Sequence, residues 1–592
     1  MDLKKLIEEN ICNYIFSNYE LKVSYIEIQS TRKEYKGDIT VVIFPLIKLL
    51  KKSPLDLGSE IGDHLLSEIK LIENYNVIHG FLNLNISNNY YIQLLKKVIS
   101  QKKFGISEPN EDSPLYLVEF SSPNTNKPLH LGHIRNILLG SAISNILEAN
   151  GKKVVRTQII NDRGIHICKS IVAWQNFAKN DTPDITHTKG DHFVGKYYVL
   201  FEKIYREQVS DLMKDGYDKK YAEKNASIFQ DAQNLLLKWE SGDKEVIKLW
   251  KKMNNWVYRG FQQTYSELNV HFDSNYYESK TYLTGKKVVE KGVADKIFSK
   301  KSDGSVWVDL SEDGLDEKIL LRSDGTSVYI TQDIGTAILR YENNPEMKGV
   351  IYTVGSEQDY HFKVLFKILE KLKYSWSHNL HHLSYGMVDL PSGKMKSREG
   401  TVVDADEIID EMKSRASNIS DELGKIQDFT LNEKDQLNKM IGMGALKYFI
   451  LKVDSKKRIL FNPDESIDFN GNTGPFIQYT HARIQSLLKK GGELSDNLND
   501  SLIINVKEKQ IIKKVLEFPS VIKNAGSNLS PATIINYTYD LVKDYNSYYQ
   551  SVSILKISDK EMKNFRMSLS LMVARIIRNS MNLVGIDVPE KM

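Results

Sequence analysis

The sequence predicts an α/β protein, with a parallel-sheet domain that carries an insertion, an α+β domain before it and an all-helical domain after it. Three observations support this fold class. A strand, a helix and a second strand follow one another within residues 115–160, a charged helical stretch then interrupts the strand-rich pattern, and nearly everything after residue 400 has helical periodicity. At 592 residues the chain is also too long for a single hydrophobic core.

Residues 1–112 are predicted to form the α+β domain. Helical stretches alternate there with strand-like runs, DITVVIFPL and NVIHGFLNLNIS, and the polar segment SEPNEDSP resembles a linker. The first residues, MDLKKLIEENICNYIF, have an amphipathic helical rhythm that includes acidic residues, which fits neither a signal peptide nor an Arg-rich transit peptide. We therefore expect a cytoplasmic protein.

The parallel sheet is predicted from the next segment. LYLVEF, residues 115–120, is apolar enough for a strand covered on both faces, and the polar loop SSPNTNKP follows it. Apolar residues then recur at helical spacing from Leu131 to Asn150, Gly151 fits a helix C-terminus, and KVVRTQII begins a second strand. This βαβ unit indicates a Rossmann-type sheet, and its ligands should bind beyond the carboxyl ends of the strands, where the polar loop lies.

The rest of the chain completes the domain plan. Long charged helices from about 185 to 300 are predicted to be an insertion, after which KILLRSDGTSVYITQDIGTAILRY and GVIYTVG resume the βα pattern. We therefore place the Rossmann-type domain at 113–400, a helical stem or linker at 401–470 and an α-helical domain at 471–592.

Composition narrows the possible functions. No apolar run is long enough to cross a bilayer, and the two cysteines, Cys12 and Cys168, are too few for a disulfide framework or a thiolate metal site. The net charge of +4, from 80 basic and 76 acidic residues, permits a polyanionic partner without requiring one. There is no Walker A pattern, and no G-x-G-x-x-G follows a predicted strand.

His130 and His133 flank a Leu-Gly pair at the start of the predicted helix. A zinc pair is one interpretation, but no matching carboxylate or cysteine pair can be named, and two solvent-facing helix-start residues are another. A phosphate site explains more of the loop, because imidazole donors, Gly132 and the N–H groups of a helix N-terminus all favour an anion.

The loop GKMKSREG, Gly393 to Gly400, is bounded by glycines and carries Lys394, Lys396 and Arg398. A solvated basic turn is the commoner meaning of such a run. A lid of cations over a triphosphate becomes the better interpretation when a phosphate site exists elsewhere, and HLGH supplies that site.

HLGH followed by KMKS resembles the paired signatures of class I aminoacyl-tRNA synthetases. The segments VEFSSPNTNKPLHLGHIRN, LRSDGTSVYITQDI, NTGPFIQYTHARI and LVGIDVPEKM closely resemble arginyl-tRNA synthetases, over residues 115–592, and the N-terminal stretch is compatible with that family's additional tRNA-contacting domain. The resemblance implies an arginine–tRNA ligase. Such an enzyme activates L-arginine with ATP, aided by Mg²⁺, to arginyl-adenylate and pyrophosphate, and then transfers arginine to the 3′-terminal adenosine of tRNA(Arg).

The resemblance also implies roles for individual residues. Those that would hold arginine are Glu119, Asn124, Tyr329, Asp333 and Gln358. Catalysis would rest on His130, His133, Lys127, Lys394 and Lys396, and ATP would contact His130, Gly132, His133, Lys394, Met395, Ser397 and Arg398. The helical C-terminal domain would bind the anticodon, with Tyr479, His481 and Arg483 as tRNA contacts. No metal ion bound by the protein itself is implied.

Two departures from the family pattern stand out. The second lysine of the lid signature falls at Ser397, so either Lys394 or Lys396 could meet the pyrophosphate, and Lys127 is expected to compensate. Arg163 occupies a position where many relatives carry tryptophan, which we expect to affect local packing.

The acidic pair fits a cationic substrate. A carboxylate at the end of a buried strand is costly unless it is paired or solvated, which favours a ligand role for Glu119, whereas Asp333 could also be an acid in a first helical turn. Asn124 and Gln358 could equally be turn residues.

The sequence also allows two other functions. The first is a class I synthetase for another amino acid, with lysine as the second candidate substrate. The other is a protein without enzymatic activity, namely a synthetase-like RNA-binding or regulatory protein. ATP–pyrophosphate exchange would separate an enzyme from such a protein. We expect a monomer with no membrane partner.

Overall fold

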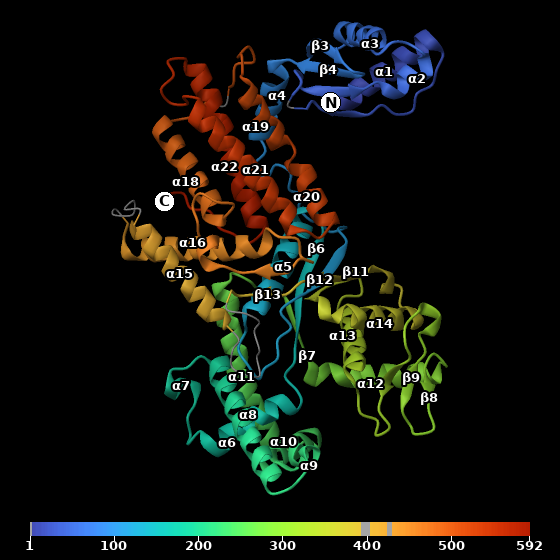
Figure 1. Ribbon diagram of the computed structural model, residues 1–592, viewed down its shortest axis with the longest axis vertical. Coiled ribbons are helices and arrows are strands. Elements are labelled where there is room, and N and C mark those ends of the chain that lie inside the picture. The colour runs from blue at the N-terminus through green and yellow to red at the C-terminus, as the bar shows by residue number, and fades with distance from the viewer. Residues whose placement is uncertain (1–2, 33, 392–402, 423–428, 496) are drawn as a thin grey trace. The chain divides into compact units, whose positions relative to one another are not determined.

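The computed structural model describes residues 3–32, 34–391, 403–422, 429–495 and 497–592. They form two compact units (Figure 1). One comprises Met1–Phe104, Leu487–Leu516 and Lys543–Val573, and the other comprises Gly105–Ser486, Glu517–Val542 and Ala574–Met592. Within the described residues no helix is both long and apolar enough to cross a membrane.

The larger unit is built on a five-stranded parallel sheet, which confirms the predicted Rossmann-type fold. The strand order is β12-β11-β5-β6-β7. The strands are β5 (Leu115–Glu119), β6 (Lys153–Ile160), β7 (Ser274–Tyr277), β11 (Met347–Gly355) and β12 (Leu380–Tyr385). The carboxyl ends of β5, β6 and β11 therefore meet at one edge of the sheet, where ligands bind in this fold class.

Helix α5 (Leu131–Ala149) connects β5 to β6 and is buried on nearly all sides. It contacts β6 and β11 of the sheet and also the later helices α15 (Ala405–Glu422), α16 (Leu431–Leu451) and α20 (Phe518–Ser527). Gly140 lets α5 approach the end of β5, because a Cβ there would lie 2.3 Å from the side chain of Phe120. The middle of α5 therefore packs directly against the carboxyl end of β5.

Arg135 on α5 ties two distant loops together. Its guanidinium is fully buried and donates to the carbonyl oxygens of Gly386 at 2.7 Å, Ser455 at 2.8 Å and Lys457 at 2.8 Å. These loops lead into β13 (Val388–Asp389) and β14 (Ile459–Leu460), which pair in parallel. Arg135 therefore fixes the strand that immediately precedes the segment carrying the basic loop.

A helical insertion separates β6 from β7. After α6 (Ile165–Phe177) come α7 (Pro183–Thr186), α8 (Gly190–Lys214), α9 (Lys219–Asn225), α10 (Ser227–Glu240) and α11 (Lys244–Glu267). Figure 1 shows α6 and α8–α11 gathered as one helical group. The insertion differs from the expected range of about 185–300, since the chain returns to the sheet at β7.

Beyond β7 the chain forms α12 (Glu278–Ala294) and a small antiparallel sheet in the order β10-β9-β8. Its strands are β8 (Ser299–Lys300), β9 (Val306–Val308) and β10 (Lys318–Leu321). Helix α13 (Tyr329–Asn343) then leads to β11, and α14 (Asp359–Lys371) leads to β12. The remainder is mainly helical, as predicted, with α17 (Pro463–Ser466), α18 (Gly474–Gly491), α21 (Pro531–Ser551) and α22 (Lys560–Leu583).

The smaller unit contains the predicted α+β domain. An antiparallel sheet in the order β1-β2-β4-β3 packs with helices. The elements are α1 (Leu3–Tyr19), β1 (Ile28–Ser30), β2 (Ile39–Val42), α2 (Phe44–Leu50), α3 (Pro54–Glu68), β3 (Ile72–Ile78), β4 (Phe81–Ile86) and α4 (Asn88–Ile99). Helix α19 (Val506–Leu516) joins this unit, because Lys513 contacts Asp38 at 2.6 Å and α19 contacts α4.

Candidate active site

The two histidines of HLGH form a reciprocal cap at the start of α5. His130 is the N-cap residue in extended conformation, and its Nδ1 accepts a hydrogen bond from the N–H of Gly132 at 3.1 Å. His133 reaches back, so that its Nδ1 accepts from the N–H of His130 at 3.1 Å. The ring centroids lie 3.9 Å apart. Main-chain N–H groups therefore orient both imidazoles, and the two rings also pack against each other.

Burial sets the protonation state of both rings, and the cap sets their tautomer. Burial lowers the pKa of His130 to about 4, with Lys127 adding to the effect, and burial beside His130 and Lys127 lowers the pKa of His133 well below its usual value. Both rings are neutral at pH 7. Because each Nδ1 accepts a hydrogen bond, the single proton of each ring is on Nε2, which leaves two N–H donors for a ligand.

The loop before HLGH is tied to the carboxyl ends of three strands. The N–H of Thr125 donates to the carbonyl of Asn161 after β6 at 3.0 Å. Asn136 of α5 accepts from the N–H of Ser121 at 2.5 Å and donates to the carbonyl of Thr353 in β11 at 2.7 Å. The loop is therefore a built part of the sheet edge rather than an ordinary connection.

The chain beyond the basic loop returns to the histidine motif. Leu131 donates to the carbonyl of Val403 at 3.3 Å, and Ala405 donates to that of Leu129 at 3.0 Å. The predicted lid residues Lys394, Met395, Lys396, Ser397 and Arg398 lie outside the described residues. A cavity of about 230 Å³ lies beside this strand pairing, and Lys127, His130, His192 and Asp404 are among its lining residues.

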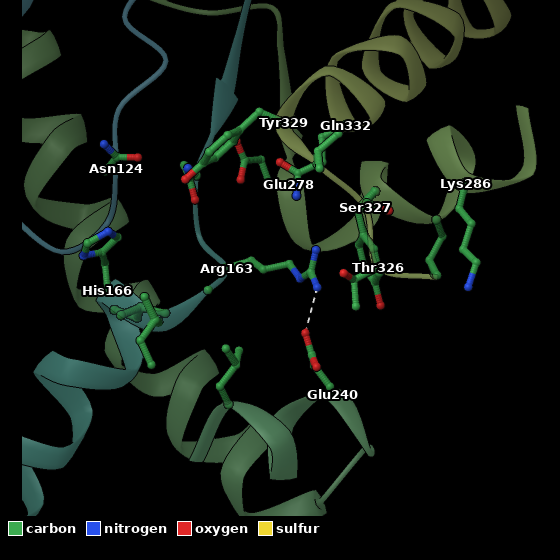
Figure 2. A pocket seen from close by; sticks show the side chains of 18 of the residues that line it. Asn124, Arg163, His166, Glu240, Glu278, Lys286, Thr326, Ser327, Tyr329 and Gln332 are labelled. Carbon is green, nitrogen blue, oxygen red and sulfur yellow. Dashed lines mark hydrogen bonds and ion pairs between the residues drawn. The ribbon is translucent and has the colours of Figure 1, made fainter. Parts of the chain in front are cut away.

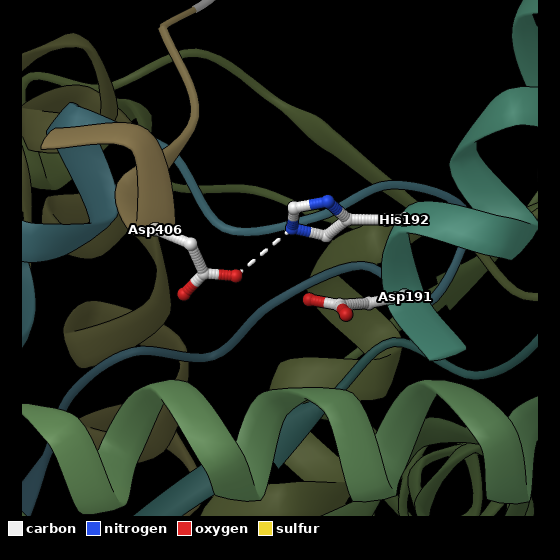
Figure 3. A group of neighbouring side chains, drawn as sticks. All are labelled: Asp191, His192 and Asp406. Carbon is white, nitrogen blue, oxygen red and sulfur yellow. Dashed lines mark hydrogen bonds and ion pairs between the residues drawn. The ribbon is translucent and has the colours of Figure 1, made fainter. Parts of the chain in front are cut away.

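A charged cluster holds this returning segment in place (Figure 3). Nε2 of His192 on α8 lies 2.9 Å from Asp406 and 3.3 Å from Asp404, and these contacts raise the pKa of His192 to about 10. The ligand atoms of Asp191, His192 and Asp406 lie within 4.8 Å of one another, as a metal site would require. However, the ammonium of Lys189 lies 2.5 Å from Asp406 and 3.2 Å from Asp191, so the cluster already contains its own cation.

The arginine-site residues are only partly brought together. Asn124 and Tyr329 line one pocket of about 630 Å³, and the side chain of Tyr329 is 74% exposed. Asp333, on the next turn of α13, accepts from Nε2 of His361 at 2.6 Å. Gln358 ends the short turn after β11, beside the start of α14.

Glu119 has a partner that the sequence did not reveal. Its carboxylate forms an ion pair with Arg340 of α13, and its Oε1 accepts from Oγ of Ser122 at 3.0 Å. The Arg340 side chain is 1% exposed and that of Glu119 is 8% exposed. Since the buried carboxylate is paired, its position at a strand end no longer argues by itself for a ligand.

The 630 Å³ pocket also contains charged residues that we did not predict (Figure 2). Arg163 after β6 pairs with Glu240 of α10 at 2.9 Å, and its guanidinium lies 3.9 Å from the ring centroid of Tyr282. Glu278 at the start of α12 and Gln332 on α13 are further polar residues of the lining. Glu278 directly follows β7, so recognising that strand in SNYY would have indicated it.

The predicted tRNA contacts lie on α18 and differ in exposure. His481 is fully buried, where its Nδ1 lies 2.8 Å from the carbonyl oxygen of Pro589. The guanidinium of Arg483 lies 4.7 Å from the ring centroid of Tyr479, and both residues are half-buried. On this helix Tyr479 and Arg483, but not His481, present surface to a ligand.

Comparison with known proteins agrees with this geometry. The catalytic domain of class I (R) tRNA synthetases matches residues 94–462, the DALR anticodon-binding domain matches 477–592, and the arginyl-tRNA synthetase N-terminal domain matches 1–86. The arginine–tRNA ligase of Flavobacterium psychrophilum is 54% identical over the full length of both chains. That of Bacteroides thetaiotaomicron is 52% identical over 97% of this chain and 96% of its own.

Solved structures show the same fold at lower identity. The arginyl-tRNA synthetase of Thermus thermophilus superposes with a TM-score of 0.77, at 24% identity and complete coverage of both chains. The Plasmodium falciparum enzyme gives a TM-score of 0.74 at 21% identity, over 100% of this chain and 99% of its own.

A parallel sheet with the HLGH cap at its carboxyl edge and a matching catalytic domain define a class I aminoacyl-tRNA synthetase. Within that class, the domain matches and the identity along the whole length place the chain in the arginyl-tRNA synthetase family. The resemblance seen in the sequence motifs is thereby confirmed.

Proposed function

We propose that the chain ligates arginine to tRNA(Arg) in two steps. ATP and L-arginine first give arginyl-adenylate and pyrophosphate, and the arginyl group then passes to the 3′-terminal adenosine of the tRNA. The observation that carries this proposal is the 54% identity to an arginine–tRNA ligase along the entire chain. The reciprocal histidine cap at the sheet edge supports it, since it offers an anion two fixed donors.

In the activation step the carboxylate of arginine attacks the α-phosphorus of ATP, and pyrophosphate leaves. The carboxylate is already ionised at neutral pH, so no general base is needed. Nε2–H of His130 and of His133 would donate to the phosphate oxygens, and Lys127 would oppose their charge. Neutral histidines suit this role because they donate without titrating near pH 7. Gly132 lets the phosphates approach the helix N-terminus.

The basic loop would supply further cations. Lys394 and Lys396 are the candidates for the pyrophosphate, and Met395, Ser397 and Arg398 for the remainder of ATP. The chain just beyond this loop is hydrogen-bonded to the histidine motif, since Val403 and Ala405 pair with Leu131 and Leu129. This pairing supports the proposal that the basic loop and HLGH bind the same ligand.

Mg²⁺ would accompany ATP rather than occupy a protein cage. Among the described residues lining the cavity at His130, Asp404 is the one carboxylate, and it is paired with His192. Phosphate oxygens are therefore the better ligands, as is usual for this ion. When bound there, Mg²⁺ neutralises charge on the phosphates.

The arginine side chain would lie in the pocket lined by Asn124 and Tyr329, with Asp333 as the carboxylate for its guanidinium. Asn124 and Gln358 would meet its α-amino and carboxylate groups. For Glu119 the arginine-binding role remains a prediction, because Arg340 already shares its carboxylate.

Two regions of the chain would bind tRNA. The helical C-terminal domain would bind the anticodon loop through Tyr479 and Arg483, with His481 buried behind them, and residues 1–112 would make an additional tRNA contact. We further propose that the enzyme is cytoplasmic and works as a monomer.

The test is ATP–pyrophosphate exchange that depends on arginine, measured with and without tRNA. Wild type should exchange with arginine and not with lysine, and Asp333→Ala should lose the activity. Exchange with lysine instead would keep the class and overturn the substrate, whereas no exchange under either condition would indicate a binding protein.

A further inference from the structure

Two carboxylates lie beside the histidine motif, where the chain returns after the basic loop. Asp404 lies opposite His130 in an antiparallel bridge, and main-chain hydrogen bonds of 3.0 and 3.3 Å on either side of His130 hold the two segments together. Asp404 also lines the cavity of about 230 Å³ at His130, and its Oδ1 accepts from the N–H of Asp406 at 2.8 Å. Carboxylates at a site for a polyanion repel it unless cations neutralise their charge.

Two cations from the start of α8, in the helical insertion, neutralise these carboxylates. Lys189 is the N-cap residue of α8, and its ammonium lies 2.5 Å from Asp406. Nε2 of His192 lies 2.9 Å from Asp406 and 3.3 Å from Asp404 (Figure 3). His192 is charged at pH 7, because its contacts with Asp404 and Asp406 raise its pKa to about 10. Each aspartate therefore has a cationic partner from the insertion.

The start of α8 packs closely against α11, so its cations are held at fixed positions. A Cβ on Gly260 of α11 would lie 2.2 Å from Oδ1 of Asp191. The hydroxyl of Thr264, which is buried on α11, accepts from the ammonium of Lys189 at 2.6 Å and donates to Asp406 at 2.9 Å. A continuous set of ion pairs and hydrogen bonds therefore joins the insertion to the segment that faces HLGH.

We propose that Lys189 and His192 are positioning residues for the activation step. They hold Asp404 and Asp406 in place and neutralise them, so that the segment opposite His130 stays fixed and the triphosphate meets no uncompensated carboxylate. Each acts through an aspartate rather than on ATP itself. This inference rests on the proposed function, and it gives the helical insertion a part in the use of ATP.

A purely structural role would only fasten the insertion together, and another ion pair of the insertion provides the comparison. The ammonium of Lys169 on α6 lies 2.7 Å from Glu202 on α8, and the two side chains are 11% and 16% exposed. The side chains of Lys189 and Asp406 are similarly enclosed, at 17% and 24%. Neither Lys169 nor Glu202 lines the cavity at His130. Lys169→Met therefore removes a comparable ion pair at a place that does not face HLGH.

The experiment compares wild type, Lys189→Met and Lys169→Met in arginine-dependent ATP–pyrophosphate exchange at neutral pH, with and without tRNA, well below the melting temperature of each protein. Lys189→Met should lower kcat/KM for ATP by about tenfold or more and leave the KM for arginine within about twofold, because small displacements at the reacting phosphates are costly. Lys169→Met should also lower the melting temperature, but its kcat/KM for ATP should stay within about twofold of wild type.

A double-mutant cycle tests whether the contact itself matters. Lys189→Met combined with Asp406→Asn should be no worse than Lys189→Met alone, since the two residues act as a unit. If the losses in kcat/KM for ATP of the two single variants multiply in the double variant, the inference is overturned.

The inference is also overturned if Lys189→Met has the same kcat/KM for ATP as Lys169→Met, or if the KM for arginine worsens as much as that for ATP. If Lys189→Met fails to fold, His192→Gln decides. A loss confined to ATP in His192→Gln supports the inference, and an unchanged kcat/KM for ATP overturns it. An inactive wild type would refute the proposed function and this inference with it, whereas an active wild type with an unaffected Lys189→Met would refute the inference alone.

Discussion

Nδ1 of His133 accepts a hydrogen bond from the main-chain N–H of His130 at 3.1 Å, while Nδ1 of His130 accepts from Gly132. The two imidazoles thus cap the N-terminus of their own helix and leave Nε2 of each ring for a ligand. One motif therefore performs two tasks, since it satisfies helix N–H groups and fixes the tautomers that donate to phosphate.

The first prediction concerns these two rings. His133→Ala and His130→Ala should each lower kcat of arginine-dependent exchange by about 100-fold, because one donor to the developing phosphate charge is lost. Affinity for tRNA should change less than twofold, measured by filter binding. If tRNA affinity fell as much as kcat, the substitutions would have disrupted the structure around the cap. The loss of kcat would then not be due to the Nε2 donors alone.

The second prediction is the pH dependence of stability that these rings cause. Their folded-state pKa values are depressed, His130 to about 4, so the unfolded chain binds more protons between about pH 4 and 6.5. The free energy of unfolding should therefore fall as the pH drops through this window, by about 3 kcal/mol from His130 alone. In urea unfolding, the free energy of unfolding should differ less between pH 5 and pH 7 for His130→Asn than for wild type. An identical difference in the two proteins would contradict the depressed pKa of His130.

The third prediction separates structure from substrate binding at Glu119. Glu119→Gln leaves the buried Arg340 without its counter-charge and should cost about 3–5 kcal/mol in urea unfolding. Arg340→Gln combined with Glu119→Gln removes both charges and should recover much of that loss. If the double variant and Arg340→Gln have the same KM for arginine, Glu119 is a structural residue. If the KM of the double variant is about tenfold higher, Glu119 also binds arginine.

Several elements of the fold are encoded in local sequence patterns. The βαβ unit, the start of α5 at HLGH and the helical C-terminal part follow from periodicity and helix-end signals within a few turns of chain, and the structure has them. β7 was not predicted, because SNYY shows no alternation of apolar and polar residues, and Glu278 was missed with it.

Pairings between distant residues could not be predicted from one sequence. The partner of Glu119 is Arg340, and Lys189 meets Asp406 at 2.5 Å, each across more than two hundred residues of chain. No local spacing encodes such contacts, since only the folded sheet brings them together. For the same reason His481 resembled a surface residue beside Arg483, although its ring packs against the C-terminal segment.

The fourth prediction concerns the cluster that holds residues 403–406. Because its pKa is raised in the folded protein, protonated His192 adds to the free energy of unfolding. This contribution is complete below about pH 6.5 and is lost as the pH rises through about 10. Burial alone would raise the pKa of Asp406, but His192 and Lys189 lower it, so its contribution is lost only in strong acid. His192→Gln should cost about 2 kcal/mol at pH 6.5 and much less at pH 10, whereas exposed His378→Gln should show no such trend.

The last prediction tests how α18 is used. His481→Gln removes a buried contact to the carbonyl of Pro589, so it should lower the melting temperature by several degrees while tRNA affinity stays within about twofold. Arg483→Ala should leave the melting temperature nearly unchanged and weaken tRNA binding several-fold at low salt, with the slope of log K against log salt reduced by about one. Arg415→Ala, whose guanidinium is already paired with Glu411 at 2.7 Å, is the control for the loss of a cation. If His481→Gln weakened tRNA binding as much as Arg483→Ala does, the C-terminal segment that covers His481 would have to move when tRNA binds, and α18 would present all three residues to the RNA.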